Sequence, residues 1–547
     1  MKFRSALSVS ITRDFFRIRE CPQNPDAGCR QQLDYMHSVY LLLFFILFAP
    51  ISTTALNYDL IVAHDGSGDL TTIQAAIDAA PANAAMPFVI LIKNGIYNEK
   101  IFIDKPFITL TGENRDSTSI IYAELRANWL KDHPDDDWGS AVLNIGNNAN
   151  NLILANLTIY NNYGALSGNH DHQFAVRGFD ATRIIIINCT IKADGGDTLS
   201  LWNRISGMYY HAYCTFEGWV DYVCPRGWCY ITDCKFFGYN TPSASIWHDG
   251  SKNEDQKFII KNSYFDGVPG FPLGRNHRDA QFYILDCLFS EHMADRPIYQ
   301  AKDSTSYQWG QRYYYFHDHR TDGDYNWFAD NLWTAENPPA PRDITPVWTF
   351  QNRWDPEKEI PAIVPFAAIP KPQDGTYKVD LEPLLTWLPA DQAICYRIHF
   401  GISNPPDLVL EVNEPLYMPG KLKPDTQYYW YIDVVAEEGI ERGALWTFKT
   451  ETVLIPPPAS NPSPADWAGD VQVPLRKLFW EMDITIADTA KLYFGINPDS
   501  IKLTHAGTTA GWNPGPLTAA NTYYWRVDLV NKNGRSTGDL WRFTLPK

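Results

Sequence analysis

The chain has 547 residues, a formal net charge of −17 and a sequence pI near 5.2. At this length two or three domains are expected instead of a single core. The acidic balance argues against a nucleic-acid partner, because a phosphate backbone is bound by basic surfaces.

The N-terminal region contains one membrane-like stretch, residues 39–51, which is too short to span a bilayer comfortably. Thr53 and Ala55 follow it with a spacing that suits signal-peptidase cleavage after Ala55. The segment before this stretch is long for a signal peptide, so a true start at Met36 is the simpler interpretation. We therefore predict that residues 1–55 are a targeting segment and that the mature protein is secreted or periplasmic, with no stable membrane insertion.

The next segment predicts a cap for a repetitive fold. A short strand and a Gly-rich turn are followed by an amphipathic helix in which Ile73, Ala76, Ile77 and Ala80 share one face. Pro81 follows the end of this helix. A helix at this point would cover the apolar interior that the first coil of a solenoid otherwise exposes.

Residues 184–289 contain five variations on one short apolar strand. Such a period, with short strands and polar turns between them, indicates an all-β solenoid of stacked coils. We interpret the position that these strands share as a buried ladder of small apolar side chains. This position advances by 20 to 29 residues and is occupied by Cys189, Cys214, Cys234, Ser263 and Cys287.

The remaining cysteines after the targeting segment leave a question open. Cys224 and Cys229 flank a Pro-Arg-Gly-Trp turn and could form a disulfide in an oxidising compartment. Cys395 is expected to be a lone buried thiol. The spacing of the cysteines and histidines does not resemble a zinc site, and no metal is expected.

The C-terminal part carries a second repeat. Proline-rich linkers are predicted at 355–373 and 451–463. Beyond the first linker, FGI, YYW and W-T-F or W-R-F motifs recur at an offset of 94 or 95 residues. Short alternating strands in modules of this size indicate two β-sandwiches, expected at 374–450 and 462–547. Their aromatic residues are expected in the cores, although sugar binding is an alternative. The pattern resembles fibronectin type III-like modules of secreted bacterial enzymes, which act as spacers or binding adaptors.

A possible catalytic group follows the period of the coils. Gln173, Asp197 and Asp221 are each 24 residues apart, so coil stacking would make the two carboxylates neighbours on one wall. Repulsion between them would keep a proton on one acid, leaving the other free to attack an ester carbonyl. Gln173 could then stabilise the oxyanion. Arg275 is the candidate cation for the attacking acid, but spacing alone does not place it there. The alternative is that Asp197 belongs to an ordinary turn.

Several motifs resemble those of pectin methylesterases. The similarity lies in their order and spacing across residues 58–335. The motifs are HDGSGDLTTIQAAIDAAP (64–81), NGIYNEKIFI (94–103), HQFAV (172–176, resembling Q-A-V-A-L), GDTL (196–199, Q-D-T-L), WVDYVCPRG (219–227, V-D-F-I-F-G) and LGRNH (273–277, L-G-R-P-W).

This resemblance implies a right-handed parallel β-helix over residues 56–355. It implies a secreted esterase that removes methyl groups from galacturonate in pectin, releases methanol and needs no cofactor. By the same resemblance, Asp221 would be the nucleophile and Asp197 the acid and base. Arg275 would hold Asp221, and Gln173 would contribute to the oxyanion site.

The sequence departs from the family motifs at three places. Gly196 stands where the family has Gln, which removes an oxyanion donor worth about 3 kcal/mol. His277 replaces a Trp, and residues 224–226 replace the usual start after the nucleophile. The substrate could therefore be a branched pectic region or another uronic ester. Candidates to replace the missing donor are Trp202, Asn203, His248 and Arg226. The residues expected to bind substrate are Trp202, Arg226, Trp247, His248 and His277, with plain loop packing as the alternative.

Two other functions remain open at this stage. A β-helix polysaccharide lyase would need Ca²⁺, and a hydrolase would need acids spaced to admit a water. A non-catalytic or weakly active pectin-binding protein would account for Gly196. In all three cases the expected partner is a pectic polysaccharide, and the protein is expected to be a monomer.

Overall fold

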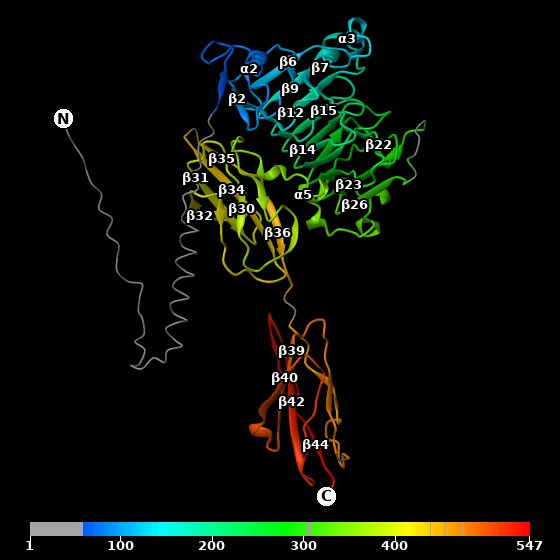
Figure 1. Ribbon diagram of the computed structural model, residues 1–547, viewed down its shortest axis with the longest axis vertical. Helices are drawn as coiled ribbons and strands as arrows, with labels where there is room; N and C mark the ends of the chain where they lie inside the picture. The colour runs from blue at the N-terminus through cyan, green and yellow to red at the C-terminus, as the bar shows by residue number, and fades with distance from the viewer. Residues whose placement is uncertain (1–57, 303–306, 308, 438, 453–454, 473) are drawn as a thin grey trace, which may run out of the picture. The chain divides into compact units, whose positions relative to one another are not determined.

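The computed structural model describes residues 58–547 except 303–306, 308, 438, 453–454 and 473 (Figure 1). The predicted targeting segment, residues 1–55, lies outside the described residues. Within the described part, no helix is both long enough and apolar enough to span a bilayer.

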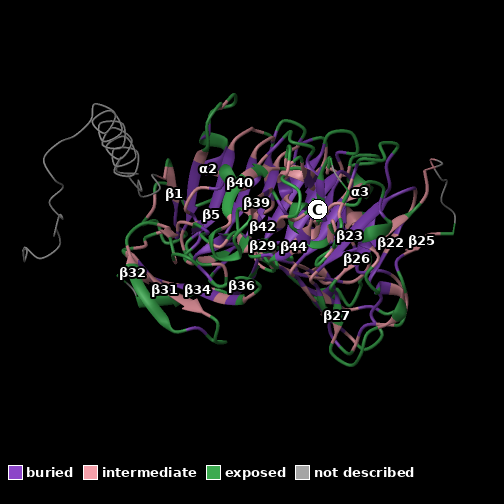
Figure 2. Cartoon of the chain, turned by 90° about the horizontal axis from the view of Figure 1, so that it is seen from below, coloured by how far each residue is buried: buried purple, intermediate pink, exposed green. Residues whose placement is uncertain are grey.

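Three parallel sheets make up the first large domain, and each coil of the chain adds one strand to each sheet. Sheet A has ten strands, in spatial order β1 (Leu60–Val62), β2 (Phe88–Ile92), β5 (Ile108–Gly112), β8 (Leu152–Ala155), β11 (Ile184–Ile187), β14 (Met208–Ala212), β17 (Trp228–Thr232), β20 (Phe258–Lys261), β23 (Gln281–Leu285) and β26 (Arg312–Phe316). Of these strands, β5 and β23 are buried along their whole length (Figure 2).

Sheets B and C stack in the same direction. Sheet B contains β3 (Gly95–Tyr97), β6 (Thr118–Tyr122), β9 (Thr158–Asn161), β12 (Thr190–Ala193), β15 (Thr215–Gly218), β18 (Lys235–Gly238), β21 (Tyr264–Gly267), β24 (Leu288–Phe289) and β27 (His319–Arg320). Sheet C contains β4 (Ile101–Ile103), β7 (Ala141–Ile145), β10 (Phe174–Gly178), β13 (Leu199–Leu201), β16 (Val223–Pro225), β19 (Ile246–His248), β22 (Gly274–Asn276) and β25 (Tyr299–Gln300). The predicted parallel β-helix is confirmed, with the right-handed winding that parallel crossovers adopt.

A single residue in the left-handed conformation makes each corner between sheets A and B. Asn188 has φ 49°, and the equivalent positions Asp233, Asn262 and Asp286 have φ between 49° and 54°. Asn and Asp tolerate this region because their short polar side chains bond locally. The residue after each corner points inward, which is why the shared position carries small apolar side chains.

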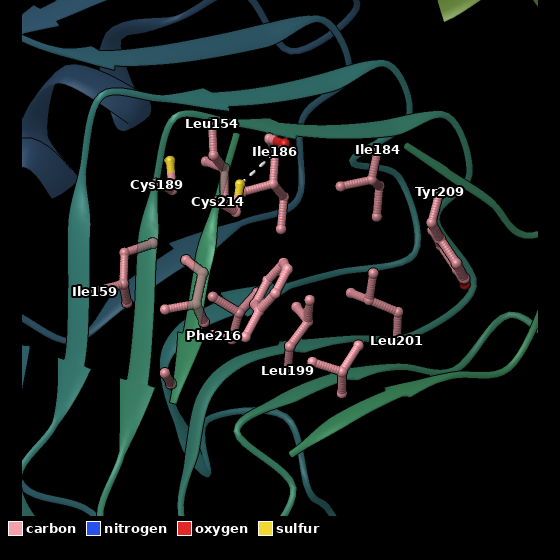
Figure 3. Close-up of a cluster of buried hydrophobic side chains, with 14 of the residues drawn as sticks. Leu154, Ile159, Ile184, Ile186, Cys189, Leu199, Leu201, Tyr209, Cys214 and Phe216 are labelled. Carbon is pink, nitrogen blue, oxygen red and sulfur yellow. Dashed lines mark hydrogen bonds between the residues drawn. The ribbon is translucent and has the colours of Figure 1, made fainter. Parts of the chain in front are cut away.

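The cysteine ladder is confirmed as part of the interior. Cys189, Cys214, Cys234 and Cys287 are at most 2% exposed, and Figure 3 shows Cys189 and Cys214 with the surrounding aliphatic residues. A further inward row stacks Phe216, Phe236, Phe265 and Phe289 at centroid separations of 5.4, 4.2 and 5.5 Å. Repetition of the coil thus places like side chains above one another in the core.

The possible Cys224–Cys229 disulfide is wrong, because both residues are free thiols. Cys229 lies in the core on β17 of sheet A. Cys224 follows the inward Val223 on β16 of sheet C, so its side chain lies on the outer face. The turn between them therefore joins two walls of the coil and not two strands of a hairpin.

The helix predicted as a cap is α2 (Ile73–Ala79), and its Ile73, Ala76 and Ile77 are buried. Thr72 accepts a hydrogen bond from the Ala75 N–H at the start of the helix. The other helical segments are α3 (Arg126–Asp132), α4 (Tyr163–Ser167), α5 (Pro346–Thr349), η1 (Asn326–Phe328), η2 (Leu332–Thr334), η3 (Pro341–Asp343), η4 (Pro356–Lys358) and η5 (Pro498–Ser500).

The first C-terminal module consists of two sheets around one core. Its strands are β28 (Ala368–Lys371), β30 (Leu385–Leu388) and β33 (Leu416–Tyr417) in one sheet, and β29 (Thr376–Val379), β31 (Cys395–Gly401), β32 (Leu408–Val412), β34 (Gln427–Ala436), β35 (Gly439–Arg442) and β36 (Trp446–Thr450) in the other. β28 lies upstream of residue 374, within the stretch predicted as linker, because it pairs with β30. Cys395 is half-buried and not fully buried.

The second module repeats this arrangement. Its strands are β37 (Ser460–Ser463), β38 (Leu478–Glu481) and β41 (Gly511–Trp512), and β39 (Thr489–Gly495), β40 (Lys502–Gly507), β42 (Thr522–Asn531), β43 (Gly534–Ser536) and β44 (Trp541–Thr544). The Trp430–Trp446 and Trp525–Trp541 pairs both have centroids 4.8 Å apart, and all four rings are at most 5% exposed. The repeated aromatic residues are therefore core residues, and the resemblance to fibronectin type III-like modules stays a prediction.

Candidate active site

The two candidate carboxylates occupy equivalent positions in adjacent coils. Each precedes a strand of sheet C by two residues, and the strands pair with Leu199 opposite Val223. The Asp197 N–H donates to the Val220 carbonyl at 2.8 Å. Asp197 and Asp221 both adopt the left-handed region, with φ of 59° and 49°. This conformation interrupts the alternation of the strand and allows both acids to lie outside the core.

Arg275 forms a two-point ion pair with Asp221. Its Nε lies 3.0 Å from Asp221 Oδ1, and its Nη2 lies 2.5 Å from Oδ2. Arg275 is on β22 and Asp221 precedes β16, so the side chain crosses the intervening strand β19. The structure thus brings together the cation and the acid that spacing alone could not connect. Such a planar pair fixes the orientation of the carboxylate.

Burial raises the pKa of both acids. The pKa of Asp221 rises to about 6 because burial and the charge of Asp197 outweigh the opposing hydrogen bond from Arg275. Burial also raises the pKa of Asp197, against the charges of His172, Arg226, Arg177 and Arg275. Neighbouring acids of this kind titrate as a pair. Arg275 contacts Asp221 and not Asp197, so this ion pair favours the ionised form of Asp221 more than that of Asp197.

Gln173 lies one coil before Asp197, and its amide is held by the backbone of its own coil. Its Oε1 accepts from the Gly164 N–H at 2.8 Å, and its Nε2 donates to the Asn169 carbonyl at 2.5 Å. A Cβ on Gly195 would come within 2.6 Å of this Nε2, so the amide packs against the backbone that leads to Asp197. One of its two N–H groups remains for another acceptor.

Gly196, the departure from the family motif, is tightly enclosed. A Cβ there would lie 2.7 Å from Val220 Cγ1. A longer side chain at this position requires Val220 to move, and Val220 adjoins Asp221. Val220 in its present position therefore leaves no room for a Gln side chain at residue 196.

Comparison with known proteins identifies the domain. Residues 59–268 match the family model described as Pectinesterase. These residues form a pectinesterase-family domain.

Relatives of the pectinesterase domain include plant proteins. "Probable pectinesterase 56" of Arabidopsis thaliana is 34% identical over 180 residues, which cover 32% of this chain and 57% of that protein. "Pectinesterase" of Petunia integrifolia is 33% identical over 183 residues, covering 32% of this chain and 43% of that protein. The chain thus spans only part of the length of these curated relatives.

Two solved structures also align with part of this chain. Pectin methylesterase PemA from Erwinia chrysanthemi aligns with a TM-score of 0.45 and 20% identity, over 55% of this chain and 99% of that one. Pectin methylesterase from carrot aligns with a TM-score of 0.41 and 20% identity, over 50% of this chain and 88% of that one.

The predicted substrate-binding residues of the pectinesterase domain separate into two groups. Trp202 is partly exposed and the His277 side chain is 41% exposed. Arg226 and Trp247 are buried against each other, because the Arg226 guanidinium lies between the rings of Trp202 and Trp247 at 3.8 and 4.3 Å. Trp247 in turn meets the edge of His277 at 4.9 Å. Only the first group presents surface to a polymer directly.

His248 and Asn203 are corrections to the sequence-based interpretation. His248 is 2% exposed, accepts from the Gly250 N–H and donates through Nε2 to the Gly227 carbonyl at 3.0 Å. Asn203 is 4% exposed and its Nδ2 donates to the Asp180 carbonyl at 2.6 Å. Both side chains are committed to turns at the ends of sheet C strands, which leaves neither as a surface contact or an oxyanion donor.

The structure adds three charged residues that sequence reasoning missed, namely Arg177, Asp249 and Arg278. Arg177 is buried under Trp202 at 4.0 Å and pairs with Asp137 at 2.5 Å. Arg204, Asp249 and Arg278 lie near His277. The signal in the sequence was the repeated charged residue shortly after each sheet C strand, in LWNR, WHDG and GRNHR.

Proposed function

We propose that the pectinesterase domain hydrolyses methyl esters of galacturonate in pectin and releases methanol. The observation that carries this proposal is the two-point pair of Arg275 with Asp221, next to Asp197 in the adjacent coil. Family membership of residues 59–268 supports the reaction class. The proposed reaction uses no cofactor.

Acylation begins with attack of the ionised Asp221 on the ester carbonyl. A tetrahedral oxyanion forms, and Gln173 has one N–H available to stabilise it. Asp197 then donates its proton to the departing methoxide oxygen. Methanol leaves, and an anhydride joins the uronate carbonyl to Asp221.

Deacylation reverses the role of Asp197. The ionised Asp197 removes a proton from a water, and the water oxygen attacks the uronate carbonyl. The anhydride breaks, Asp221 returns as a carboxylate, and the uronate unit is left as the free acid, which then loses its proton to solvent. Asp197 again holds the proton, so the cycle closes without another reactant. The raised pKa of Asp197 suits both roles, because the group must gain and lose a proton near neutral pH.

The oxyanion site has one hydrogen-bond donor fewer than the family motif would supply, because residue 196 is Gly. With Gly196 in place of Gln, loss of one donor costs about 3 kcal/mol of transition-state stabilisation. We therefore propose a slow esterase whose substrate differs from plain methylated homogalacturonan. Trp202 and His277 are the exposed groups proposed to meet the sugar chain.

The rest of the chain fits a secreted enzyme. We propose that residues 1–55 direct export and that the two C-terminal modules act as spacers or binding adaptors. The competing function is a pectin-binding protein with little or no activity, which Gly196 favours.

Methanol release from methylated pectin tests the proposal. We expect release by the wild type and a loss of at least about 10³-fold in Asp221→Asn, since the nucleophile is removed. Asp318→Asn is the matched control. Asp318 is 5% exposed and Asp221 is 6% exposed, and the Asp318 carboxylate accepts a hydrogen bond from the backbone N–H of Cys287. Absence of methanol from a panel of esterified uronates, with pectin still bound, would favour the binding protein. Chain cleavage with unsaturated ends would indicate a lyase.

A further inference from the structure

The proline-rich stretch after the β-helix packs against the outer face of sheet A. We call residues 355–374 the strap. Its buried residues Ile360, Ile363, Val364 and Ala368 form one hydrophobic cluster with outward side chains of β8, β11, β14, β17 and β20. The strap is therefore held on sheet A by burial of apolar surface.

Two hydrogen bonds join the strap to corners of the β-helix. The Ile369 N–H donates to the Tyr213 hydroxyl at 2.9 Å. The side-chain amide of Asn156 donates to the Ile363 carbonyl. Tyr213 and Asn156 both occupy the left-handed corner position between sheets A and B. The strap thus has a defined register on the sheet.

Three carboxyl groups line one small cavity beside the strap. Asp233 lies at the corner after β17, Glu357 is in η4 at the start of the strap, and Asp374 ends the strap. The cavity has a volume of about 20 Å³, which is room for about one water molecule. Gln373 also lines it, and its side-chain oxygen has no hydrogen-bond partner within the described residues. Little water is therefore available to hydrate ionised carboxylates here.

The lysines beside the cavity do not neutralise all three acids. Lys261 on β20 lines the cavity and is 3% exposed, but it forms no salt bridge within the described part of the chain. Lys371 Nζ lies 3.3 Å from Glu357 Oε2, and its side chain is 51% exposed. If all three acids were ionised, they would exceed the lysines by one charge.

Other charged groups near the cavity have partners of their own. Asp355 pairs with Lys358 at 2.9 Å. Asp286, whose charge acts on Asp374, pairs with His317 at 3.1 Å. Asp374 itself accepts hydrogen bonds from the backbone and side chain of a β36 residue. These groups supply no further cation to the cavity.

The remaining titratable groups at the cavity are tyrosines. Burial raises the pKa of Tyr210, Tyr213 and Tyr230 well above the usual value. The Tyr210 hydroxyl donates to Glu357 Oε1 at 3.4 Å. All three rings therefore stay neutral over the pH range in which carboxyl groups ionise.

Asp233 is the acid of the cavity with the least support for its charge. Within the described residues it forms no salt bridge, and its carboxylate accepts only the Thr232 hydroxyl, at 2.6 Å. Burial and the charges of Asp374 and Glu357 raise the pKa of Asp233 to about 7, against that hydrogen bond and the charge of Lys261. Burial also raises the pKa of Glu357 and of Asp374. Release of the strap would return Asp233 to water and to an ordinary carboxyl pKa of about 4.

We propose that the strap is a clasp that is closed in acid and opens as the pH rises through neutrality, with Asp233 as the group that titrates. The closed state holds a proton on Asp233 that the open state has released, so a higher pH favours opening. This effect ends once the pH exceeds the pKa of Asp233 in the closed state. The strap continues into β28 of the first C-terminal module, so its release also loosens the attachment of that module. The clasp does not depend on the esterase function.

The test is amide hydrogen exchange of residues 360–371 in the full chain, corrected for the intrinsic exchange rate at each pH. A pKa of about 7 in the closed state and of about 4 in the open state predict that the opening equilibrium rises about tenfold from about pH 6 to about pH 8. Asp233→Asn should lose most of this rise. Asn is compatible with the corner, because Asn262 occupies the equivalent position in the next coil.

Tyr213→Phe is the matched control, because it weakens the clasp without changing its charge. The variant removes the hydroxyl that accepts from the Ile369 N–H, and it should raise exchange about fivefold at both pH values. The tenfold ratio between the two pH values should remain.

Three results would overturn the clasp. The first is equal opening at the two pH values in the wild type, and the second is the full tenfold rise in Asp233→Asn. The third is an equal loss of protection in residues 184–187 of β11, which would mean that the whole domain unfolds and not the strap alone.

Discussion

Removal of Arg275 should shift the pH at which the enzyme becomes active. Asp221 must be ionised to attack, and its pKa of about 6 already includes the lowering effect of the Arg275 hydrogen bond and charge. An opposite charge at this distance lowers a carboxyl pKa by about 1–3 units, which corresponds to about 1.4–4 kcal/mol. In Arg275→Gln the acid limb of kcat/KM should therefore move upward by about 1–3 pH units.

The assay is methanol release from methylated pectin across about pH 4 to 9, a range that brackets the pKa of Asp221 on both sides. At pH 6 the wild-type Asp221 is about half ionised, so an upward shift of one pKa unit or more should make the variant at least about fivefold slower than the wild type. Arg275→Lys should show a smaller shift, because it keeps the charge but loses the planar two-point contact. An acid limb that stays in place in Arg275→Gln would refute the assignment of Asp221 as the ionised nucleophile.

Three further predictions concern the same domain. Asp221→Asn should gain stability relative to the wild type as the pH rises from about 4 to about 6, because over this range the native wild type holds a proton on Asp221 that its unfolded chain has released. The gain in the free energy of unfolding is at most about 3 kcal/mol. Denaturant unfolding that gives the same difference between the two proteins at every pH would contradict this. Gly196→Gln alone should lower methanol release, because the Cβ of the new side chain would lie 2.7 Å from Val220 Cγ1. The added change Val220→Ala should restore or exceed the original rate. A single variant as active as the double variant would show that the Val220 side chain moves aside without cost. Reducing agent should leave the melting temperature unchanged, because Cys224 and Cys229 are free thiols, and a fall of several degrees would mean that a disulfide exists.

The sequence was informative where the coil repeats. The shared Cys and Ser position follows from a corner that requires a left-handed residue, which is Asn or Asp in four of the five repeats and Tyr213 in the other, and then a small inward side chain. The same repeat placed Asp197 and Asp221 at equivalent positions. Periodic backbone geometry is a local property, so a sequence pattern can report it.

The sequence was less informative where a side chain reaches beyond its own coil. Coil length varies, so residue spacing could not show that Arg275 crosses β19 to reach Asp221. His248 was expected at the surface, but the turn after β19 directs both ring nitrogens to backbone groups. The ion pairs of Asp249 with Arg204 and Arg278 join residues of different coils, and no single segment of the sequence reveals them. Tertiary contacts of long side chains decide these cases.

The most direct test of the two-acid mechanism uses a galacturonate ester with an activated phenol as leaving group. Such a phenol departs without a proton, so Asp197→Asn should release about one equivalent of it per enzyme and then stop, because water still lacks its base. Asp221→Asn should release none above background. A burst in Asp221→Asn, or steady turnover in Asp197→Asn, would contradict the division of labour between the two carboxylates.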